Sequence, residues 1–330
     1  MNIPGFVDLQ VNGYKGVDFS SSDLTVERFQ FACWELIKQG TILFLPTIIS
    51  SSEEIYQQNL KLISEVIEET DLKNYIPGIH LEGPFISDVD GARGAHNPKW
   101  IKKPDSYFLD QLVEWSGGKI KLLTIAAELD GADELCRHAT DLGIKVSLGH
   151  QMASQADLQR LSDSGASLLT HLGNGIPQII DRHDNPIWAG LANDDLTAMI
   201  ITDGHHLPPS LIKTILKVKG ASNTIIVSDA SPIAGLSPGN YSTLGNKVIL
   251  KESGRLYNPE TGYLVGSSST MIDCMNYLHS LQLLNKKELL DVGFFNPLRF
   301  LKMDPDEIAD RFNSRIELDE YFIFFDDSIF

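Results

Sequence analysis

Four side chains that could bind a metal ion or move a proton follow short apolar runs of the chain. Glu82 lies in HLEGPF, His150 in SLGHQ, His171 in THLGN and Asp229 in SDAS. One carboxylate and two imidazoles that leave coordination positions open form a ligand set of hydrolytic metal sites. An aspartate beside such a site can accept a proton from a water molecule. The residue types therefore predict a metal-dependent hydrolase with Asp229 as its base.

Each of these residues also has a structural interpretation. A single histidine at a strand end is often only a hydrogen-bonded structural residue. Glu82 could cap a helix or form an ion pair, and Asp229 could cap the next turn. The joint pattern at four different strand ends is less easily explained this way, but from spacing alone both interpretations stay open. Polar residues follow other runs too, namely Gln10, Asn12, His80, Asp203, His205 and His206.

Eight apolar runs precede these polar residues, and helical patterns separate many of them. Continuous β-branched runs predict strands buried on both faces of a parallel sheet. The runs are Phe6–Val11, Thr41–Ile49, Ile76–Leu81, Lys121–Ala126, Ile144–Leu148, Ala166–Thr170, Ala198–Thr202 and Thr224–Ser228. The predicted helices between them are Leu24–Gln39, Ser52–Glu69, Ala132–Leu142, Gln155–Ser164 and Pro209–Val218.

Eight such units favour a (β/α)₈ TIM-type barrel, which places chemistry at the C-terminal ends of its strands. A doubly wound open sheet is the alternative, but it usually has six strands. We expect one barrel domain over 1–330, with a β-hairpin insertion over 247–265 and a C-terminal tail over 302–330. Helices are predicted at Met271–Leu284 and Lys287–Leu301, and one or two strands at Arg315–Phe330.

The composition limits the kinds of partner and the cellular compartment that we expect for the protein. The 330 residues include 27 Lys+Arg and 44 Asp+Glu, a formal net charge of −17 that argues against a nucleic-acid partner. Cys33, Cys136 and Cys274 are odd in number and far apart, which predicts no disulfide framework and fits a reducing cytoplasm. The sequence has no apolar run of membrane-spanning length and no signal-peptide pattern at its start. We therefore expect a cytoplasmic protein with no membrane partner.

Nine motifs give the chain a resemblance to a known family. They are PGFVDLQVNGYKGVDF (4–19), HLEGPFIS (80–87), GAHNP (94–98), SLGH (147–150), THLGNGIP (170–177), TDGHHL (202–207), SDASPIAGL (228–236), LVGSSSTM (264–271) and NPLRFL (296–301). In this order they resemble the N-acetylglucosamine-6-phosphate deacetylases of the amidohydrolase superfamily. The resemblance implies hydrolysis of the acetamide of N-acetylglucosamine 6-phosphate in amino-sugar catabolism.

The resemblance also implies roles for single residues. Glu82, His150 and His171 match the metal ligands of the family, and Asp229 matches its catalytic aspartate. His96 matches the histidine that contacts the acetamide carbonyl and stabilises the oxyanion. The implied cofactor is one divalent ion, Zn²⁺ with Fe²⁺ or Co²⁺ as alternatives, which acidifies a water molecule.

Further positions match the family's contacts with the sugar phosphate. His206 matches the histidine of the D-G-x-H motif that holds the sugar, and Asn174 and Gly175 match a loop whose backbone amides bind phosphate. Arg182 matches an arginine that reaches the phosphate in a neighbouring subunit, which implies a homodimer. Gln10 and Asn12 stand where two-metal relatives carry His-x-His. Since amides are poor zinc ligands, we expect a weak or absent second metal and place both residues on the substrate side.

The chain also departs from the family pattern. The P-G-F motif begins at Pro4, so the accessory β-sandwich looks reduced or absent. Gly173 replaces an aromatic residue, and 175–176, 182–188 and 231–233 differ as well. These changes leave two other hypotheses open. One is an amidohydrolase that deacylates a different N-acyl sugar or amino acid, and the other is a non-catalytic sugar-phosphate-binding protein.

Overall fold

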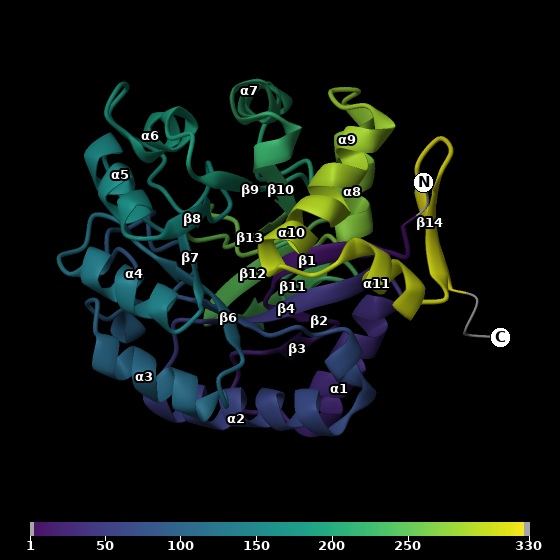
Figure 1. Cartoon of the computed structure of the whole chain (residues 1–330), viewed down its shortest axis with the longest axis horizontal. Helices are drawn as coiled ribbons and strands as arrows, with labels where there is room; N and C mark the ends of the chain where they lie inside the picture. The colour runs from purple at the N-terminus through teal and green to yellow at the C-terminus, as the bar shows by residue number, and fades with distance from the viewer. Residues whose placement is uncertain (1–2, 327–330) are drawn as a thin grey trace.

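A parallel sheet of eight strands forms the centre of the computed structural model, which describes residues 3–326 (Figure 1). Each strand is hydrogen-bonded to the next in the order β1-β4-β5-β6-β7-β8-β9-β10. The sheet closes on itself because Val11 and Ala230 form a parallel bridge, and the Asn12 amide donates to the Ala230 carbonyl over 2.8 Å. The predicted (β/α)₈ barrel is confirmed.

The barrel strands have bounds close to those predicted. They are β1 (Phe6–Val11), β4 (Thr41–Ile49), β5 (Ile79–Glu82), β6 (Ile120–Ile125), β7 (Lys145–Leu148), β8 (Ala166–Leu169), β9 (Thr197–Ile201) and β10 (Thr224–Val227). The prediction for the third run was wrong at its start, since β5 begins at Ile79 and not at Ile76. Pro77 has no N–H to donate to the sheet, and a side chain at Gly78 would lie 2.2 Å from Lys121 Cγ.

Helices surround the barrel in the order of the chain (Figure 1). They are α1 (Val26–Ile37), α2 (Glu53–Glu69), α3 (Ser106–Trp115), α4 (Ala132–Asp141), α5 (Gln155–Asp163), α6 (Pro186–Ala192), α7 (Pro209–Lys219), α8 (Met271–Ser280), α9 (Lys286–Leu290), α10 (Asn296–Leu301) and α11 (Pro305–Arg311). Short 3₁₀ turns lie at Asp71–Asn74, Pro98–Trp100 and Ala221–Asn223. Ser52, where the sequence predicted a helix to begin, caps α2, while α3 and α6 were missed.

Three helix predictions needed correction. The helix predicted over Met271–Leu284 ends at Ser280. Helix α1 begins at Val26 and not at Leu24, because the Thr25 hydroxyl accepts from the Arg28 amide and caps the first turn. The predicted helix Lys287–Leu301 is interrupted by a π-helical turn at Asp291–Phe295. Pro297 follows this turn and has no N–H for a bond to the preceding turn, which favours the wider helix there.

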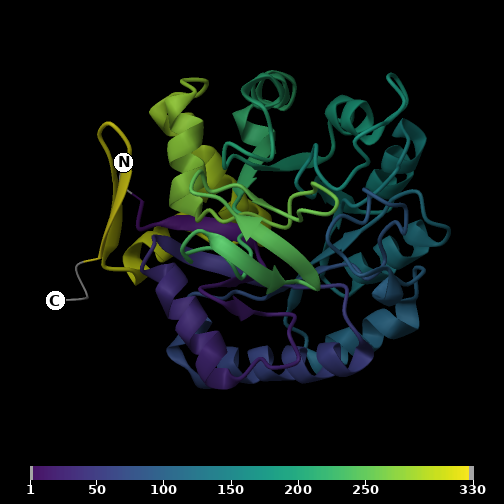
Figure 2. The same cartoon turned by 180° about the vertical axis from the view of Figure 1, so that it is seen from behind.

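A three-stranded antiparallel sheet lies across one mouth of the barrel (Figure 2). It consists of β11 (Gly239–Thr243), β12 (Asn246–Leu250) and β13 (Leu256–Tyr257), and we call residues 239–266 the β-insert. The predicted hairpin over 247–265 missed β11, so the antiparallel sheet begins earlier than expected. Buried Ile233, Val248, Leu256 and Val265 pack with Ile49 at the end of β4, which fixes the β-insert to the barrel.

Two smaller sheets complete the described residues. Strands β2 (Gly13–Tyr14) and β3 (Val17–Asp18) pair after the first barrel strand. Strands β14 (Ser314–Leu318) and β15 (Phe322–Asp326) form a hairpin in the C-terminal tail, where the sequence predicted one or two strands. The last part of that prediction, 327–330, lies outside the described residues.

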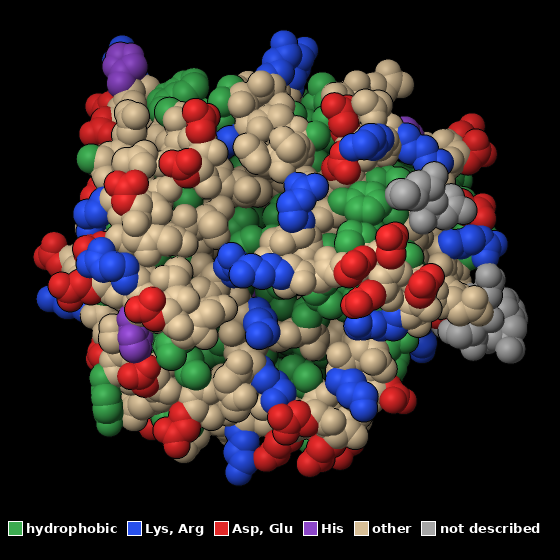
Figure 3. Space-filling view, in the orientation of Figure 1, with side chains coloured by type: hydrophobic (Ala, Val, Ile, Leu, Met, Phe, Trp, Pro, Cys, Tyr) green, Lys and Arg blue, Asp and Glu red, His purple; other side chains and the backbone are tan. Residues whose placement is uncertain are grey.

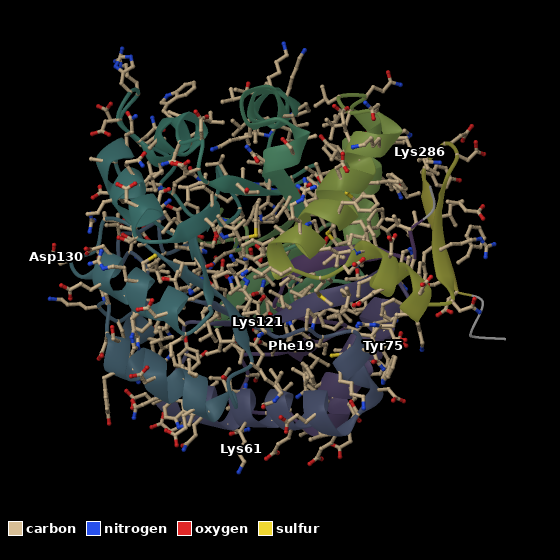
Figure 4. The ribbon with its side chains drawn as sticks, in the orientation of Figure 1. Phe19, Lys61, Tyr75, Lys121, Asp130 and Lys286 are labelled. Carbon is tan, nitrogen blue, oxygen red and sulfur yellow. The ribbon has the colours of Figure 1, made fainter. Side chains whose placement is uncertain are left out.

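The core fills the barrel and the layer between barrel and helices. Phe19 is fully buried within it, whereas Lys61 on α2 points away from the barrel (Figure 4). On the face shown in Figure 3, basic and acidic side chains are interspersed. The three cysteines are buried as free thiols. Among the described residues, no helix has the length and apolar character needed to cross a membrane.

Candidate active site

The three predicted metal ligands converge at the mouth that the β-insert faces. Glu82 is the last residue of β5, and His150 and His171 follow the ends of β7 and β8. Glu82 Oε1 lies 3.1 Å from His150 Nε2 and 3.0 Å from His171 Nε2, and the two nitrogens are 3.1 Å apart. Tetrahedral donors at zinc bond lengths would stand about 3.4 Å apart. This triangle of buried donor atoms therefore fits one divalent metal ion.

Hydrogen bonding gives His150 the tautomer that a metal ligand needs. Its Nδ1 lies 2.8 Å from the Ala92 carbonyl, which can only accept, so Nδ1 carries the proton. Nε2 is therefore the nitrogen that points at the cluster, and in the neutral ring its lone pair is available to a metal ion. When it carries a proton instead, it pairs with Glu82, which raises the pKa of His150 against the effect of burial. A bond from the second ring nitrogen to a carbonyl is the usual support of a ligating histidine.

Backbone strain marks the same residues. His150, His171 and Asp229 have φ values of 51°, 30° and 50°, in the left-handed region that residues other than glycine seldom adopt. Each such conformation costs about 1–3 kcal/mol and persists only where the surroundings impose it. The strain turns each side chain out of its strand and into the common site.

The pKa values of the two carboxyl groups, Glu82 and Asp229, are shifted in opposite directions. Burial alone would raise the pKa of Glu82, but the charge of His150 and hydrogen bonds from the histidines hold that pKa well below its ordinary value. Burial, followed by the nearby charge of Glu82, raises the pKa of Asp229 to about 6. Asp229 is thus an unusually basic aspartate beside a permanently charged Glu82.

Two neutral amides donate to Asp229, and one of them also donates to Glu82. Gln10 Nε2 donates to Glu82 Oε1 over 2.7 Å and to Asp229 Oδ1 over 3.1 Å. Asn12 Nδ2 donates to the same Asp229 oxygen over 2.7 Å. Asn12 lines the cavity of the site, whereas Gln10 is not among its lining residues. Both amides hold Asp229 by one oxygen and leave Oδ2 free of these bonds.

His96 presents a neutral imidazole to the cluster. The Ser50 backbone N–H donates to His96 Nδ1 over 3.3 Å, so the proton of the ring sits on Nε2. Nε2 lies 3.6 Å from Glu82 Oε2. Burial and, after it, the neighbouring His150 charge lower the pKa of His96 to about 4. At neutral pH this side chain can donate one hydrogen bond into the site.

His206 is held by a buried ion pair. Its Nδ1 lies 2.8 Å from Asp203 Oδ2, and the backbone amides of His205 and His206 both donate to Asp203 Oδ1 over 2.9 Å. Burial opposes the charged forms, but the pair raises the pKa of His206 and lowers the pKa of Asp203. The sequence analysis gave Asp203 no role, although its position three residues before His206 in TDGHH could have indicated the pairing.

A cavity of about 340 Å³ connects these groups to the β-insert. The barrel contributes Asn12, Glu82, His96, His150, His171, His206 and Asp229, and the β-insert contributes Leu244, Arg255, Gly262, Tyr263, Leu264 and Gly266. The sequence analysis assigned no site role to any of these β-insert residues, although Leu264 and Gly266 lie in the motif LVGSSSTM.

Of the three residues predicted to contact phosphate, two line the cavity and one does not. Asn174 and Gly175 line the cavity, but the Asn174 backbone N–H already donates to the His171 carbonyl over 2.9 Å. Gly175 has a φ of 61°, and a side chain there would come within 3.0 Å of His150. Arg182 is exposed in the loop before α6 and is not among the residues that line the cavity.

A family model for the amidohydrolase family matches residues 1–306. The chain belongs to this family. Membership confirms the predicted class, a hydrolase that acts on amides, and confirms the resemblance found in the motifs. Amidohydrolases depend on metal ions, and the Glu82, His150 and His171 cluster is where this amidohydrolase can bind one.

Individual relatives carry a narrower name. This amidohydrolase is 33% identical over 268 residues to an N-acetylglucosamine-6-phosphate deacetylase of Bacillus subtilis (strain 168), an alignment that covers 80% of the chain and 66% of the relative. It is 28% identical to the crystal structure of an N-acetylglucosamine-6-phosphate deacetylase from Pasteurella multocida, with a TM-score of 0.83 over 99% of this chain and 82% of that one.

A third comparison involves a structure with a ligand. A mutant N-acetyl-D-glucosamine-6-phosphate deacetylase from Mycobacterium smegmatis, in complex with N-acetyl-D-glucosamine-6-phosphate, is 25% identical with a TM-score of 0.82. The match covers 92% of this amidohydrolase and 78% of that chain. The barrel fold is therefore shared with these structures at low sequence identity.

Proposed function

We propose that the chain removes the acetyl group of N-acetylglucosamine 6-phosphate, giving glucosamine 6-phosphate and acetate in amino-sugar catabolism. The observation that carries this proposal is the convergence of Glu82, His150 and His171 with Asp229 and His96 in one cavity. The names of the relatives supply the substrate class.

We assign Glu82, His150 and His171 to a single divalent ion, Zn²⁺. When bound, such an ion lowers the pKa of a coordinated water toward about 7 and polarises a carbonyl group. Nitrogen and carboxylate donors in this geometry also suit Fe²⁺ and Co²⁺, and metal supply decides between them. Gln10 supports the site by donating to Glu82 and Asp229.

Asp229 is assigned the proton transfers. At neutral pH it is a carboxylate, and a pKa of about 6 makes it a better proton acceptor than an ordinary aspartate. Asn12 and Gln10 fix Oδ1, which leaves Oδ2 to take the proton of the attacking water. The same oxygen then returns the proton to the departing amine.

His96 is assigned to the carbonyl oxygen of the acetamide. Its Nε2–H can donate to the oxyanion that forms when the carbonyl carbon becomes tetrahedral. A neutral imidazole suits this role, because it donates a hydrogen bond without repelling the cation nearby. The Ser50 backbone amide keeps the ring in the required tautomer.

The sugar phosphate would lie between the barrel mouth and the β-insert. His206, Asn174, Gly175 and Asn12 line this space and are assigned to the sugar and its phosphate. Arg182 is exposed, which suits a residue that reaches a neighbouring active site in a homodimer. A dimer with Arg182 in its partner's site and a cytoplasmic location are parts of the same proposal.

Acetate release tests the proposal directly. Purified protein loaded with one equivalent of Zn²⁺ is expected to release acetate and a primary amine in equal amounts from N-acetylglucosamine 6-phosphate. Arg182→Ala should raise KM for this substrate while leaving turnover at saturation nearly unchanged. Failure of the wild-type protein on this substrate, with turnover of another N-acyl compound, would contradict the assigned substrate.

A second candidate function is deacylation of a related N-acyl sugar. Gly173 lines the cavity, and a side chain there would meet Leu207 at 2.9 Å and Leu211 at 3.3 Å. The family pattern has an aromatic residue at this place, so the wall of the cavity differs here, with Leu207 and Leu211 packed beside Gly173. Gly173→Ala should lower kcat/KM for a bulkier N-acyl group, such as N-propionyl, more than for N-acetyl if the acyl group of the substrate reaches this wall.

A further inference from the structure

Arg255 of the β-insert is the one lysine or arginine among the residues that line the cavity in the described part of the chain. The same lining contains the carboxylates of Glu82 and Asp229, and the whole chain has a net charge of −17. A phosphorylated substrate would enter this acidic surrounding with two negative charges of its own. A cation at the cavity wall, in addition to the metal ion and to His206 with its partner Asp203, would therefore favour binding of the phosphate, because like charges repel strongly at short range.

The guanidinium of Arg255 has no competing carboxylate. Within residues 3–326, no Asp or Glu oxygen forms a salt bridge with it, although most other arginines are paired. Its central carbon lies 5.1 Å from the centre of the Tyr257 ring, a cation–π distance. Stacking on a ring restrains the guanidinium plane and leaves its N–H edge available for a bidentate acceptor such as phosphate.

A tight turn holds Arg255 at the cavity. The Gly254 amide donates to the Lys251 carbonyl over 3.0 Å, and the Lys251 amide donates to the Arg255 carbonyl over 3.1 Å. Ser268 Oγ donates to the Gly254 carbonyl over 2.6 Å. The position of Arg255 is thus set by hydrogen bonds on both sides of the turn.

His205 connects this turn to the barrel. Its Nε2 lies 2.8 Å from the Ser253 carbonyl, which can only accept, so His205 donates this bond. His205 stands next to His206 in TDGHH, directly after β9. One loop of the barrel therefore supplies both a lining residue, His206, and an anchor for the turn that carries Arg255.

We propose that Arg255 binds the phosphate of the substrate from within the same chain, with His205 as a positioning residue for it. This inference rests on the proposed function, because it assigns a partner to the phosphate of that substrate. It differs from the role of Arg182, which would act in a neighbouring subunit. The phosphate subsite is then formed by the β-insert of each chain and does not depend on dimerisation alone.

Paired substrates test this assignment. Arg255→Ala should lower kcat/KM for N-acetylglucosamine 6-phosphate by about 10–100-fold, in the range expected for losing a charge-assisted hydrogen-bonded pair. The loss should fall on KM, and kcat/KM for unphosphorylated N-acetylglucosamine should not change. Arg255→Lys should recover only part of the loss, since an ammonium cannot form the bidentate pair.

Lys251→Ala is the matched control. Lys251 also lies 5.1 Å from the Tyr257 ring, but it does not line the cavity, so this variant should behave as the wild type. An unchanged KM for the phosphorylated substrate in Arg255→Ala, or an equal loss with both substrates, would overturn the proposal. His205→Ala should raise KM for the phosphorylated substrate less than Arg255→Ala does, with kcat preserved.

Binding measurements separate this inference from the proposed function. Calorimetry with glucosamine 6-phosphate and with glucosamine needs no turnover. If the wild type hydrolyses neither acetylated sugar, the proposed function fails. A tighter binding of the phosphorylated compound that disappears in Arg255→Ala would still support the phosphate subsite, and equal binding by both proteins would refute it.

Discussion

The strand ends of the barrel and the segments that face them are built in opposite ways. Glu82, His96, His150, His171 and Asp229 are each at most 8% exposed, and hydrogen bonds fix most of their polar atoms. Arg182 and Arg255 are exposed and sit on the loop before α6 and on the β-insert. The comparison teaches that the reaction centre is set by the barrel, while recognition of the substrate is left to segments that can vary.

Backbone strain also differs between the strand ends of the barrel and the segments that face them. Three residues of the centre hold positive φ values without being glycine. On the facing side, the cavity is lined by glycines such as Gly173, Gly262 and Gly266, which adopt such values without steric cost. Glycine predominates at such positions on the facing side, although Leu244 of the β-insert also has a positive φ, of 49°.

Among variants of the buried residues at the strand ends, removal of the base should give the largest loss of turnover. Asp229→Asn preserves the shape of the side chain, and its amide oxygen can still accept from Gln10 or Asn12. The amide cannot accept a proton from water. We expect kcat to fall about 10³-fold, within the usual range for a general base, with little change in KM. Steady-state kinetics on zinc-loaded protein measures this, and an unchanged kcat would show that another group accepts the proton.

Loss of the His96 donor should have a smaller effect. His96→Ala is expected to lower kcat about 10²-fold, as for the loss of one oxyanion donor. His96→Gln should recover part of this, because an amide N–H can replace Nε2–H. Metal content should stay at the wild-type level in both variants. Loss of the metal in His96→Gln would instead make His96 a ligand.

The Asp203–His206 pair lies at the boundary between the two regions, and its contribution to stability should depend on pH. Asp203 has a lowered pKa when folded, so its stabilisation is present above about pH 4 and is lost as pH falls through the folded pKa. His206 has a raised pKa, so its stabilisation is complete below about pH 6.5 and is lost as pH rises through the folded pKa.

The pair should therefore stabilise most between about pH 4 and 6.5. His206→Gln is expected to lower Tm by several degrees at pH 5.5, because it leaves a buried carboxylate unpaired at a cost of about 3 kcal/mol. The difference from the wild type should shrink at pH 9. Thermal unfolding followed by circular dichroism measures it, and a constant difference across this range would contradict an ionised pair.

Much of the barrel could be predicted because its physical signal is local. Apolar runs such as Phe6–Val11 and Thr41–Ile49 show directly that both faces of the strand are buried, and their bounds were correct. Helix α3 was missed, although Asp105 caps it, because its apolar residues alternate with exposed ones over a short length. The π-helical turn before Pro297 depends on tertiary packing that no local pattern shows.

Some residues of the site could likewise be predicted from the sequence, and others could not. Glu82, His150, His171 and Asp229 could be proposed because the carboxyl ends of parallel strands meet at one edge. The bonds from Gln10 to Glu82 and Asp229, and from Asn12 to Asp229, were not visible, since an amide in a sequence does not show what it contacts. Arg255 was missed for a similar reason, because only the folded β-insert brings it to the cavity.

The central claim is that one metal ion at Glu82, His150 and His171 supports deacetylation. The most direct measurement is a titration of metal-free protein with Zn²⁺ in which bound metal and acetate release are followed together. We predict that acetate release from N-acetylglucosamine 6-phosphate rises in proportion to bound zinc and stops at one ion per chain. Glu82→Gln should neither bind the ion tightly nor become active. Full activity in the metal-free wild type, or tight binding by Glu82→Gln at the same stoichiometry, would contradict the account.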